Sequence, residues 1–139
     1  MSSHLILDTG PWVALRCWDD AHHAWAKAQF AQYAGPFLTC EAVVAETCFP
    51  LARSGFDLGK ALALIEREVV QMAMSLADKV SEVRALFECY ENVPASLADA
   101  CLVRMSELYE PCRVITLDSG FRIHRRHERK VIPVLTPRP

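Results

Sequence analysis

The stretch LILDTGPW, residues 5–12, decides the fold, because a short apolar run ends there on an aspartate that glycine and proline follow. Strands of a parallel sheet that is covered on both faces can be apolar throughout, so their charged residues belong at the ends. The run at residues 5–7 therefore predicts a buried strand that ends at Asp8.

Further short apolar runs predict four more strands, at residues 36–39, 69–74, 113–117 and 131–135. Between these runs, apolar residues recur at helical spacing. The helical stripes are Ala26, Phe30 and Tyr33; Leu58, Ala61, Leu62 and Ile65 after an N-cap at Asp57; Val80, Val83, Phe87 and Tyr90; and Leu102, Met105 and Tyr109. The alternation predicts an α/β fold, a parallel sheet flanked by helices on both faces. Pro133 cannot donate a ladder hydrogen bond, so we expect the last strand at an edge.

The chain length, the first residues and the cysteine count argue against several classes of protein. A chain of 139 residues fits a single domain, residues 1–139. The first residues have no basic segment, and their apolar run is too short for a signal peptide or a membrane span, so we expect a cytoplasmic protein. Six cysteines without a C-x-x-C pair argue against a zinc knuckle or a disulfide framework, and we expect reduced, mostly buried thiols.

Two of the predicted strands lead into an aspartate, LILD at Asp8 and RVITLD at Asp118. Ligands of open α/β sheets bind beyond the carboxyl ends of the strands, where the strand order reverses. If the two strands are neighbours, both carboxylates meet at one rim. Each also has a structural alternative, since Asp8 can cap the helix that begins near Pro11 and Asp118 can be a turn residue in D-S-G.

Two further acids occupy unusual positions in predicted helices. In TCEAVVAETCF, Glu46 lies three residues after Val43 and three before Phe49, which predicts that it lies on the apolar face of its helix. The alternative for Glu46 is a shifted helical phase that leaves it at the surface. Asp99 opens the helix of ASLADACL, and its spacing from Ser96 also fits a capping box.

Four ionised carboxylates around one pocket would repel one another strongly. Two unit charges about 5 Å apart repel by roughly 3 kcal/mol at an effective dielectric near 20. Such a group protonates or binds a cation, and all-oxygen ligands select hard ions such as Mg²⁺ or Mn²⁺. We therefore expect a divalent cation at Asp8. The repulsion also predicts that metal-free Asp99→Asn is at least as stable as the parent protein.

The segments that hold these acids resemble the PIN-domain nucleases, and most closely the VapC-like ribonuclease toxins of toxin-antitoxin pairs. LILDTGPWVAL is similar to the family's first strand with its invariant acid, at Asp8, although Gly10 stands where a serine is common. AVVAETCF, SLADACLV and VITLDSGF match the next three acids, at Glu46, Asp99 and Asp118. The resemblance covers nearly the whole chain and rests on four acids in order, in matching local contexts.

The resemblance implies a PIN-like fold with a five-stranded parallel sheet in the order 3-2-1-4-5. It implies a Mg²⁺- or Mn²⁺-dependent endoribonuclease that hydrolyses RNA phosphodiester bonds, as the toxin of a toxin-antitoxin pair. It further implies a homodimer and an inhibitory antitoxin protein.

The same resemblance assigns roles to individual residues. The catalytic acids it implies are Asp8, Glu46, Asp99 and Asp118. The metal would be held, directly or through water, by Asp8, Asp99 and Asp118, while Glu46 positions a metal-bound water or acts on the nucleophile. Small hydroxyl residues that would orient these carboxylates are Thr9, Thr116 and Ser119.

The run RIHRRHERK, residues 122–130, holds five of the fifteen Lys and Arg residues and two of the five histidines, against one acid, Glu128. The rest of the chain is acidic, with ten basic residues against sixteen acids. We therefore expect an anionic partner, RNA, at this edge, with phosphate contacts from Arg122, Arg125 and Arg126. The alternative is a solvated face before an edge strand.

Other residues with binding chemistry lack a complete pattern. His22 and His23 are adjacent and point in different directions at a helix start. No cysteine or further histidine lies near His124 and His127 in the sequence to complete a zinc site. The tryptophans are expected in the core or at an interface, since nothing in the sequence supports base stacking: Trp12, Trp18 and Trp25.

A second hypothesis is a catalytically silent PIN-like domain that binds RNA or a protein partner through its apolar and basic surfaces. The hydrophobic fraction of 52% is the observation that favours it. Addition of Mn²⁺ separates the two hypotheses, because a metal-dependent nuclease binds the ion and should melt at a higher temperature with it. No rise in the melting temperature of the protein would favour the silent domain.

Overall fold

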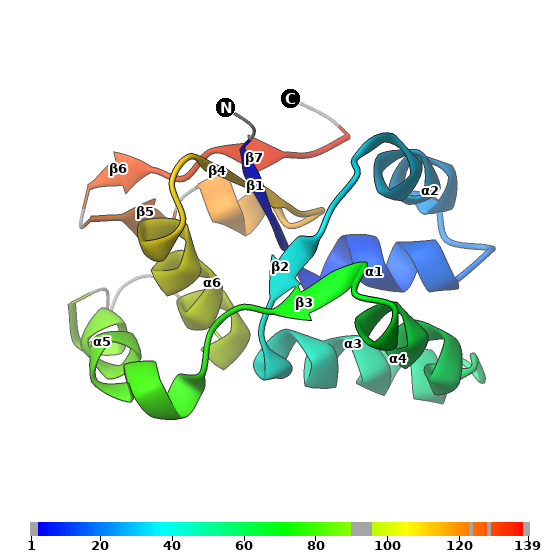
Figure 1. Ribbon diagram of the computed structural model, residues 1–139, viewed down its shortest axis with the longest axis horizontal. Helices are drawn as coiled ribbons and strands as arrows, with labels where there is room; N and C mark the ends of the chain where they lie inside the picture. The colour runs from blue at the N-terminus through cyan, green and yellow to red at the C-terminus, as the bar shows by residue number, and fades with distance from the viewer. Residues whose placement is uncertain (1–2, 90–95, 123, 128, 138–139) are drawn as a thin grey trace.

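The computed structural model describes residues 3–89, 96–122, 124–127 and 129–137, without the side chains of Cys89, Ser119 and Arg122. Figure 1 shows the elements, which follow one another as β1 (His4–Leu7), α1 (Thr9–Arg16), α2 (His23–Gln32), β2 (Phe37–Thr39), α3 (Glu41–Arg53), α4 (Leu58–Glu66), β3 (Val70–Met72), α5 (Leu76–Cys89), α6 (Leu97–Leu108), β4 (Cys112–Ile115), the short 3₁₀ helix η1 (Ser119–Arg122), β5 (Arg125–Arg126), β6 (Lys130–Val131) and β7 (Val134–Leu135).

Five of these strands form one parallel sheet in the order β3-β2-β1-β4-β7. This confirms the predicted fold class and strand order. The fifth strand of the sheet is β7, because the antiparallel hairpin β5–β6 intervenes in the chain. The order reverses between β1 and β4, and the carboxyl ends of these two strands are where a ligand of an open α/β sheet binds.

The prediction of one continuous last strand at residues 131–135 is wrong, because Pro133 divides it. Val131 pairs with Arg125 in the hairpin, whereas β7 pairs with β4. The Pro133 carbonyl accepts a hydrogen bond from the Val114 N–H at 2.8 Å, but its ring nitrogen has no proton to donate. The expected edge position of the last strand is confirmed.

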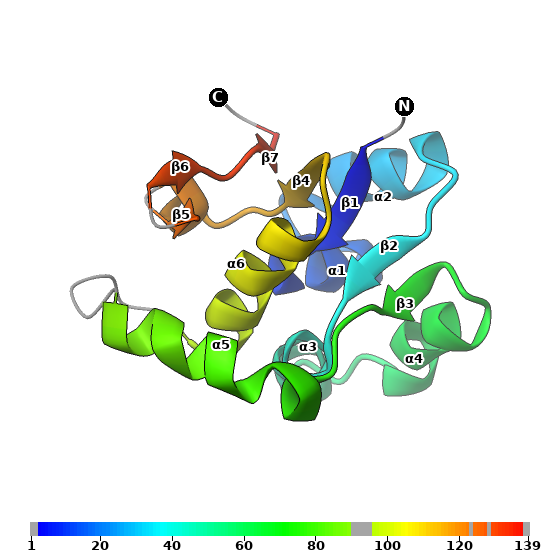
Figure 2. The ribbon, with the colours of Figure 1, turned by 60° about the vertical axis from the view of Figure 1, so that its left-hand side comes forward.

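Helices cover the sheet on both sides, and Figure 2 shows α6 on one face of β1 with α1 and α2 on the other. The stripe on α6 is confirmed, since Leu102 and Met105 are fully buried. The stripe on α5 is confirmed in part, because Val83 is buried while Val80 and Phe87 are 53% and 42% exposed. The helix α5 packs against α6 and covers only a narrow face of it. Tyr90 lies outside the described residues.

The cysteines that the structure describes are all free thiols, and those buried are Cys17, Cys40, Cys101 and Cys112. This confirms the expectation of reduced, mostly buried thiols for the described part of the chain. Within the same part, no helix combines the length and the apolarity that a membrane crossing requires.

The buried stripe of α6 predicts that two leucine-to-alanine substitutions lower the free energy of unfolding by different amounts. Leu102→Ala removes a fully buried side chain between α6 and the sheet and should lower the free energy of unfolding by about 2–5 kcal/mol. Leu62→Ala on α4, where the side chain is 41% exposed, should cost about 1 kcal/mol or less. Urea unfolding of both variants measures the difference, and equal losses would contradict the packing described for α6.

Candidate active site

Asp8 lies where β1 passes into α1, at the carboxyl end of the central strand. Its backbone N–H donates to the Ile115 carbonyl at 3.1 Å, and one oxygen of its carboxylate accepts from the Thr9 N–H at 2.7 Å. Asp8 is thus the N-cap of α1, and the structural alternative for this residue is confirmed. The carboxylate is nevertheless only 6% exposed, which is unusual for a group whose sole role is to cap a helix.

The direct neighbour of Asp8 is Thr116, the residue that follows β4, and not Asp118. The register of the parallel pair aligns Leu7 with Ile115, so the residues that follow them lie side by side. The strand β4 ends at Ile115, two residues earlier than predicted. The Thr116 hydroxyl donates to the second Asp8 carboxylate oxygen at 2.6 Å and accepts from the Asp118 N–H at 2.9 Å. This one hydroxyl therefore fixes Asp8 and the backbone of Asp118 together, and its role in orienting a metal-binding carboxylate stays a prediction.

Asp118 and Asp99 also have the structural roles considered as alternatives. Asp118 accepts a hydrogen bond from the Gly120 N–H at 2.7 Å, which makes it the turn residue of D-S-G. Asp99 forms a capping box with Ser96, in which each side chain accepts from the other residue's N–H, at 3.0 and 3.4 Å. These contacts hold both carboxylates in fixed orientations.

Burial raises the pKa of Asp8 to about 6. The hydrogen bonds from Thr116 and from the Thr9 N–H oppose this rise, and the negative charges of Asp99 and Asp118 add to it. Two of the other predicted acids therefore act electrostatically on the desolvated carboxylate of Asp8. A bound cation would reverse this effect, since it favours the ionised form.

His124 is a site residue that the sequence did not identify. It is buried, its Nε2 lies 3.8 Å from an Asp99 carboxylate oxygen, and its ring packs edge-on against Phe121. Burial raises the pKa of Asp99, but the interactions with His124 and Ser96 outweigh it, so the pKa of Asp99 lies below its usual range. The lowered pKa of Asp99 argues against the prediction that metal-free Asp99→Asn is at least as stable as the parent protein. The carboxylate whose ionisation is disfavoured is that of Asp8.

The prediction that Glu46 lies on the buried face of its helix is wrong. The buried face of α3 is formed by Val43, Thr47 and Leu51, and Glu46 is exposed. The apolar residue that suggested the wrong phase, Phe49, is itself 63% exposed. Glu46 nevertheless interacts with one of the other acids, since partial burial and the charge of Asp99 raise its pKa.

Two residues of the first turn of α1 complete the surroundings of Asp8. The Thr9 hydroxyl oxygen is buried and has no hydrogen-bond partner among the described residues. A Cβ at Gly10 would lie 3.0 Å from the Leu117 Cβ, which explains why glycine stands where the resemblance leads one to expect serine. The role of Thr9 in orienting a carboxylate stays a prediction, as does that of Ser119, whose side chain lies outside the described residues.

The four acids do not form a preassembled cage. Among the residues described, no group of three or more histidine, cysteine, aspartate or glutamate side chains is arranged to hold a metal ion. Mg²⁺ does not require such a cage, since it keeps several waters and takes one or two protein carboxylates. A desolvated Asp8 with an orphaned hydroxyl beside it and negative neighbours fits a cation of that kind.

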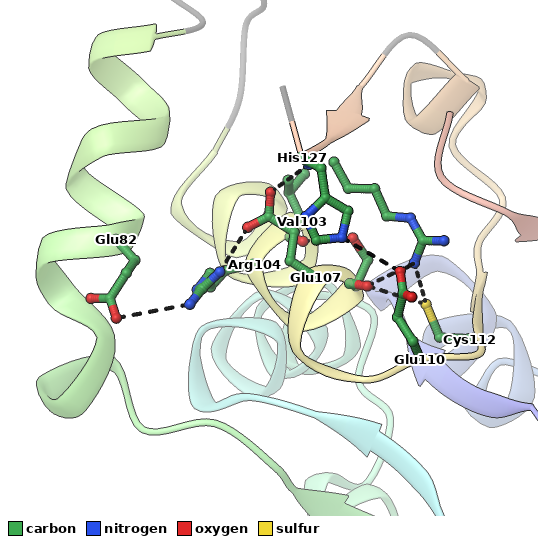
Figure 3. Close-up of polar contacts among 9 residues, drawn as sticks. Glu82, Val103, Arg104, Glu107, Glu110, Cys112 and His127 are labelled. Atoms are coloured by element: carbon green, nitrogen blue, oxygen red, sulfur yellow. Dashed lines mark hydrogen bonds and ion pairs between the residues drawn. The ribbon is translucent and has the colours of Figure 1, made fainter. Parts of the chain in front are cut away.

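The basic run is held against the protein by acids of α6 and its following loop. Arg126 forms an ion pair with Glu110 at 2.9 Å, and donates to the Ser106 carbonyl at 2.8 Å. In Figure 3, dashed contacts link Glu110 and Glu107 to His127. This packing favours a structural role for Arg126. Arg125 lies in the same hairpin, the side chain of Arg122 lies outside the described residues, and their contacts with phosphate stay predictions.

A network of charges extends from the hairpin to α5. Arg104 on α6 contacts Glu107 at 3.1 Å and Glu82 on α5 at 3.9 Å (Figure 3). The His127 N–H donates to Glu107 at 2.7 Å, at a residue whose φ of +49° lies in the left-handed region. The hairpin is thereby fixed to the C-terminal end of α6, whereas Asp99 lies in the first turn of the same helix.

The raised pKa of Asp8 predicts how stability depends on pH. A carboxyl whose folded-state pKa is raised stabilises the fold below its unfolded value near 3.8 and loses this contribution as pH rises through about 6. The unfolding free energy of the metal-free protein, relative to Asp8→Asn, should therefore fall by about 2 kcal/mol between pH 4 and pH 7. Denaturant unfolding across this range measures the difference, which would stay constant if Asp8 titrated normally.

The Thr116 hydroxyl offers a second test. Thr116→Val keeps the shape but removes the donor to Asp8 and the acceptor for the Asp118 N–H. The apparent pKa of Asp8 should rise further, and the protein should lose about 1–3 kcal/mol of stability. Thr116→Ser keeps the hydroxyl and serves as the matched control. Carbon-13 NMR titration of the carboxyl groups would contradict the account if Val and Ser variants gave the same Asp8 pKa.

Comparisons with known proteins agree with this geometry. Residues 5–126 match the family model of the PIN domain. The structure is similar to that of VapC20 of Mycobacterium tuberculosis, described as a toxin that cleaves the sarcin-ricin loop, with a TM-score of 0.70 and 24% identity over 83% of this chain and 90% of that one. At this identity the likeness shows a shared fold. No curated protein matches the chain. Because the family model spans most of its residues, this chain belongs to the PIN domain family.

Proposed function

We propose that this protein is a Mg²⁺- or Mn²⁺-dependent endoribonuclease that hydrolyses RNA phosphodiester bonds. The observation that carries the proposal is the environment of Asp8, a buried carboxylate with a pKa raised to about 6 and with Asp99 and Asp118 acting on it. A group of negative charges at the switch point of a parallel sheet is costly without a cation. Membership of the PIN family and the fold shared with an RNA-cleaving toxin support the same activity.

The metal would be held by Asp8, Asp99 and Asp118, directly or through water. When bound, a hard divalent ion polarises a phosphoryl oxygen and lowers the pKa of a coordinated water. The protein's own contribution is to keep these ligands in place. Thr116 fixes Asp8, and Ser96 fixes Asp99, so neither carboxylate has to be ordered when the ion arrives.

Glu46 is the acid best suited to handle a proton. It is exposed to solvent, and its pKa is raised by partial burial and by the charge of Asp99. A carboxylate of raised pKa accepts a proton more readily than an ordinary one, so Glu46 would position the attacking water and take its proton. His124 would hold Asp99 in the ionised form that a metal ligand requires.

The biological role that we propose is that of a VapC-like toxin neutralised by an antitoxin protein. The shared fold with a described toxin supports this role. We also propose a homodimer, because large apolar side chains of α5 and the start of α6 are exposed, namely Leu76, Val80, Phe87 and Leu97. Such a row on neighbouring helices is what an interface between two copies would cover.

Metal-dependent cleavage is the direct test. Purified protein should cleave RNA with Mg²⁺ or Mn²⁺, and either Asp8→Asn or Asp118→Asn should reduce the rate by at least about a hundredfold, because each removes a negative metal ligand. Asp78→Asn on α5, an exposed acid outside the site, is the matched control and should keep the parent rate. Gel analysis of labelled RNA fragments measures the rates.

Melting temperature gives a readout that does not depend on finding the right RNA. Mn²⁺ should raise the melting temperature of the parent and of Asp78→Asn, and should raise that of Asp8→Asn much less. Undiminished cleavage by both site variants would refute the proposed catalytic role of these acids. A melting temperature that does not respond to Mn²⁺ would favour the catalytically silent binding module.

A further inference from the structure

A second cleft lies away from the acids, between the end of α1, the start of α2 and the start of α4. It encloses about 360 Å³. Residues with binding chemistry that line it are Arg16, Trp18, His23, Lys27, Asp57 and Lys60. Trp18 was expected in the core or at an interface, but it is 75% exposed, whereas Trp12 is fully buried. A large exposed aromatic side chain beside several cations offers a surface on which a planar group can stack.

The cations of this cleft are not neutralised by the protein. Among the described residues, no carboxylate oxygen lies within 4.0 Å of the charged nitrogens of Arg16, Lys27 or Lys60. The Arg16 Nε is buried and has no hydrogen-bond partner in the described part of the chain. The one acid of the cleft, Asp57, already accepts a hydrogen bond from the Gly59 N–H at 2.8 Å as the N-cap of α4. The cleft therefore has a net positive charge available for a ligand.

The basic hairpin differs in this respect. Its Arg126 is paired with Glu110, and its His127 lies between Glu110 and Glu107. The run that looked most like an anion site in the sequence thus uses part of its charge within the protein. The unpaired cations that converge on one cavity come instead from three helices that are distant in the sequence.

We propose that this cleft binds single-stranded RNA, with phosphate groups on Arg16, Lys27 and Lys60 and a base stacked on Trp18. Clustered cations beside an exposed aromatic ring are the arrangement that binds single strands without sequence preference. An acidic peptide would also suit the cations, but it would leave the exposed indole face without a partner. The proposal rests on the proposed function, because it takes RNA as the substrate.

The position of the cleft gives it a use in that reaction. Asp8 caps the first turn of α1 and Arg16 ends the same helix, so roughly 12 Å of helix separates them. An RNA strand bound at the acids would have to extend over about this distance to reach the cleft. An adjoining cleft, which shares Trp18, Phe56 and Asp57 with this one, is lined by Asp19 and Asp20. The negative charges of these two residues favour phosphate binding at Lys27 and Lys60 instead. The cleft would hold the strand beyond the cleavage site.

Binding without cleavage tests the proposal. In EDTA, the affinity of a fluorescein-labelled oligouridine is measured by anisotropy over a range of salt concentrations. The double variant Lys27→Gln, Lys60→Gln should bind more weakly, and the slope of log affinity against log salt should fall by about 0.7 for each cation removed. Arg84→Gln, which removes an exposed cation from α5, is the matched control and should change neither quantity appreciably.

Trp18 gives an independent readout. Trp18→Ala should weaken binding about fivefold or more while leaving the salt slope unchanged, because a stacked base carries no net charge. Trp18→Phe keeps a ring and should restore most of the affinity. A loss of folding would not be restored in this way and would also appear as a lowered melting temperature.

Other results separate the two proposals. If the parent binds the oligouridine and the cleft variants bind it equally well with the same slope, the cleft is not an RNA site. Quenching of Trp18 fluorescence by a glutamate-rich peptide that oligouridine cannot displace would likewise overturn the inference in favour of an acidic protein partner. If the parent binds no RNA in any salt, the proposed nuclease function fails together with it.

Discussion

The hydrogen bond from the Thr116 hydroxyl to the Asp8 carboxylate is the contact on which the site depends. It joins the ends of β1 and β4, which lie on either side of the point where the strand order reverses. The same oxygen accepts from the Asp118 N–H, so the turn that holds Asp118 is fixed to the carboxylate of Asp8. Parallel pairing alone would bring the two segments to one rim, and this hydroxyl fixes the Asp8 carboxylate and the backbone of Asp118 relative to each other.

The carboxylates of Asp8, Asp99 and Asp118 also have structural roles in the fold. Asp8 caps α1, Asp99 closes a capping box at the start of α6, and Asp118 forms a turn. These roles looked like rivals to a catalytic role when the sequence was considered alone. In the structure they support it, because a side chain already held by backbone N–H groups loses little conformational entropy when it binds a ligand. The cost appears at Asp8, where burial opposes ionisation.

The α/β class could be predicted from the sequence because its signals are local, whereas the strand order was what the resemblance to the PIN-domain nucleases implied. Apolar runs identified the strands, and the acid at the end of the first run identified the rim. Individual side-chain positions were harder to predict where a tertiary contact decides them. Glu46 was placed on the wrong face because Phe49, which suggested the phase, is an exposed aromatic residue. The last predicted strand is divided at Pro133, because Val131 before it pairs in the hairpin and Val134 after it pairs with β4.

His124 and Arg126 show the limit of a search by sequence spacing. His124 reaches Asp99 across 25 residues of chain, and no local pattern indicates that approach. Arg126 belongs to the most basic run of the sequence, yet Glu110 pairs with it in the folded protein. Charge clusters in a sequence do not show which charges are already paired, and the cleft beside Trp18 collects its cations from three separate helices.

The central claim is that a divalent cation binds where the charges of Asp8, Asp99 and Asp118 meet. Crystals grown or soaked with Mn²⁺ and measured at its absorption edge test this most directly. The account predicts one or more anomalous peaks in contact with Asp8, directly or through water, and bordered by Asp99 and Asp118. An anomalous map without a peak beside Asp8, from crystals that bind Mn²⁺ elsewhere or not at all, would contradict it.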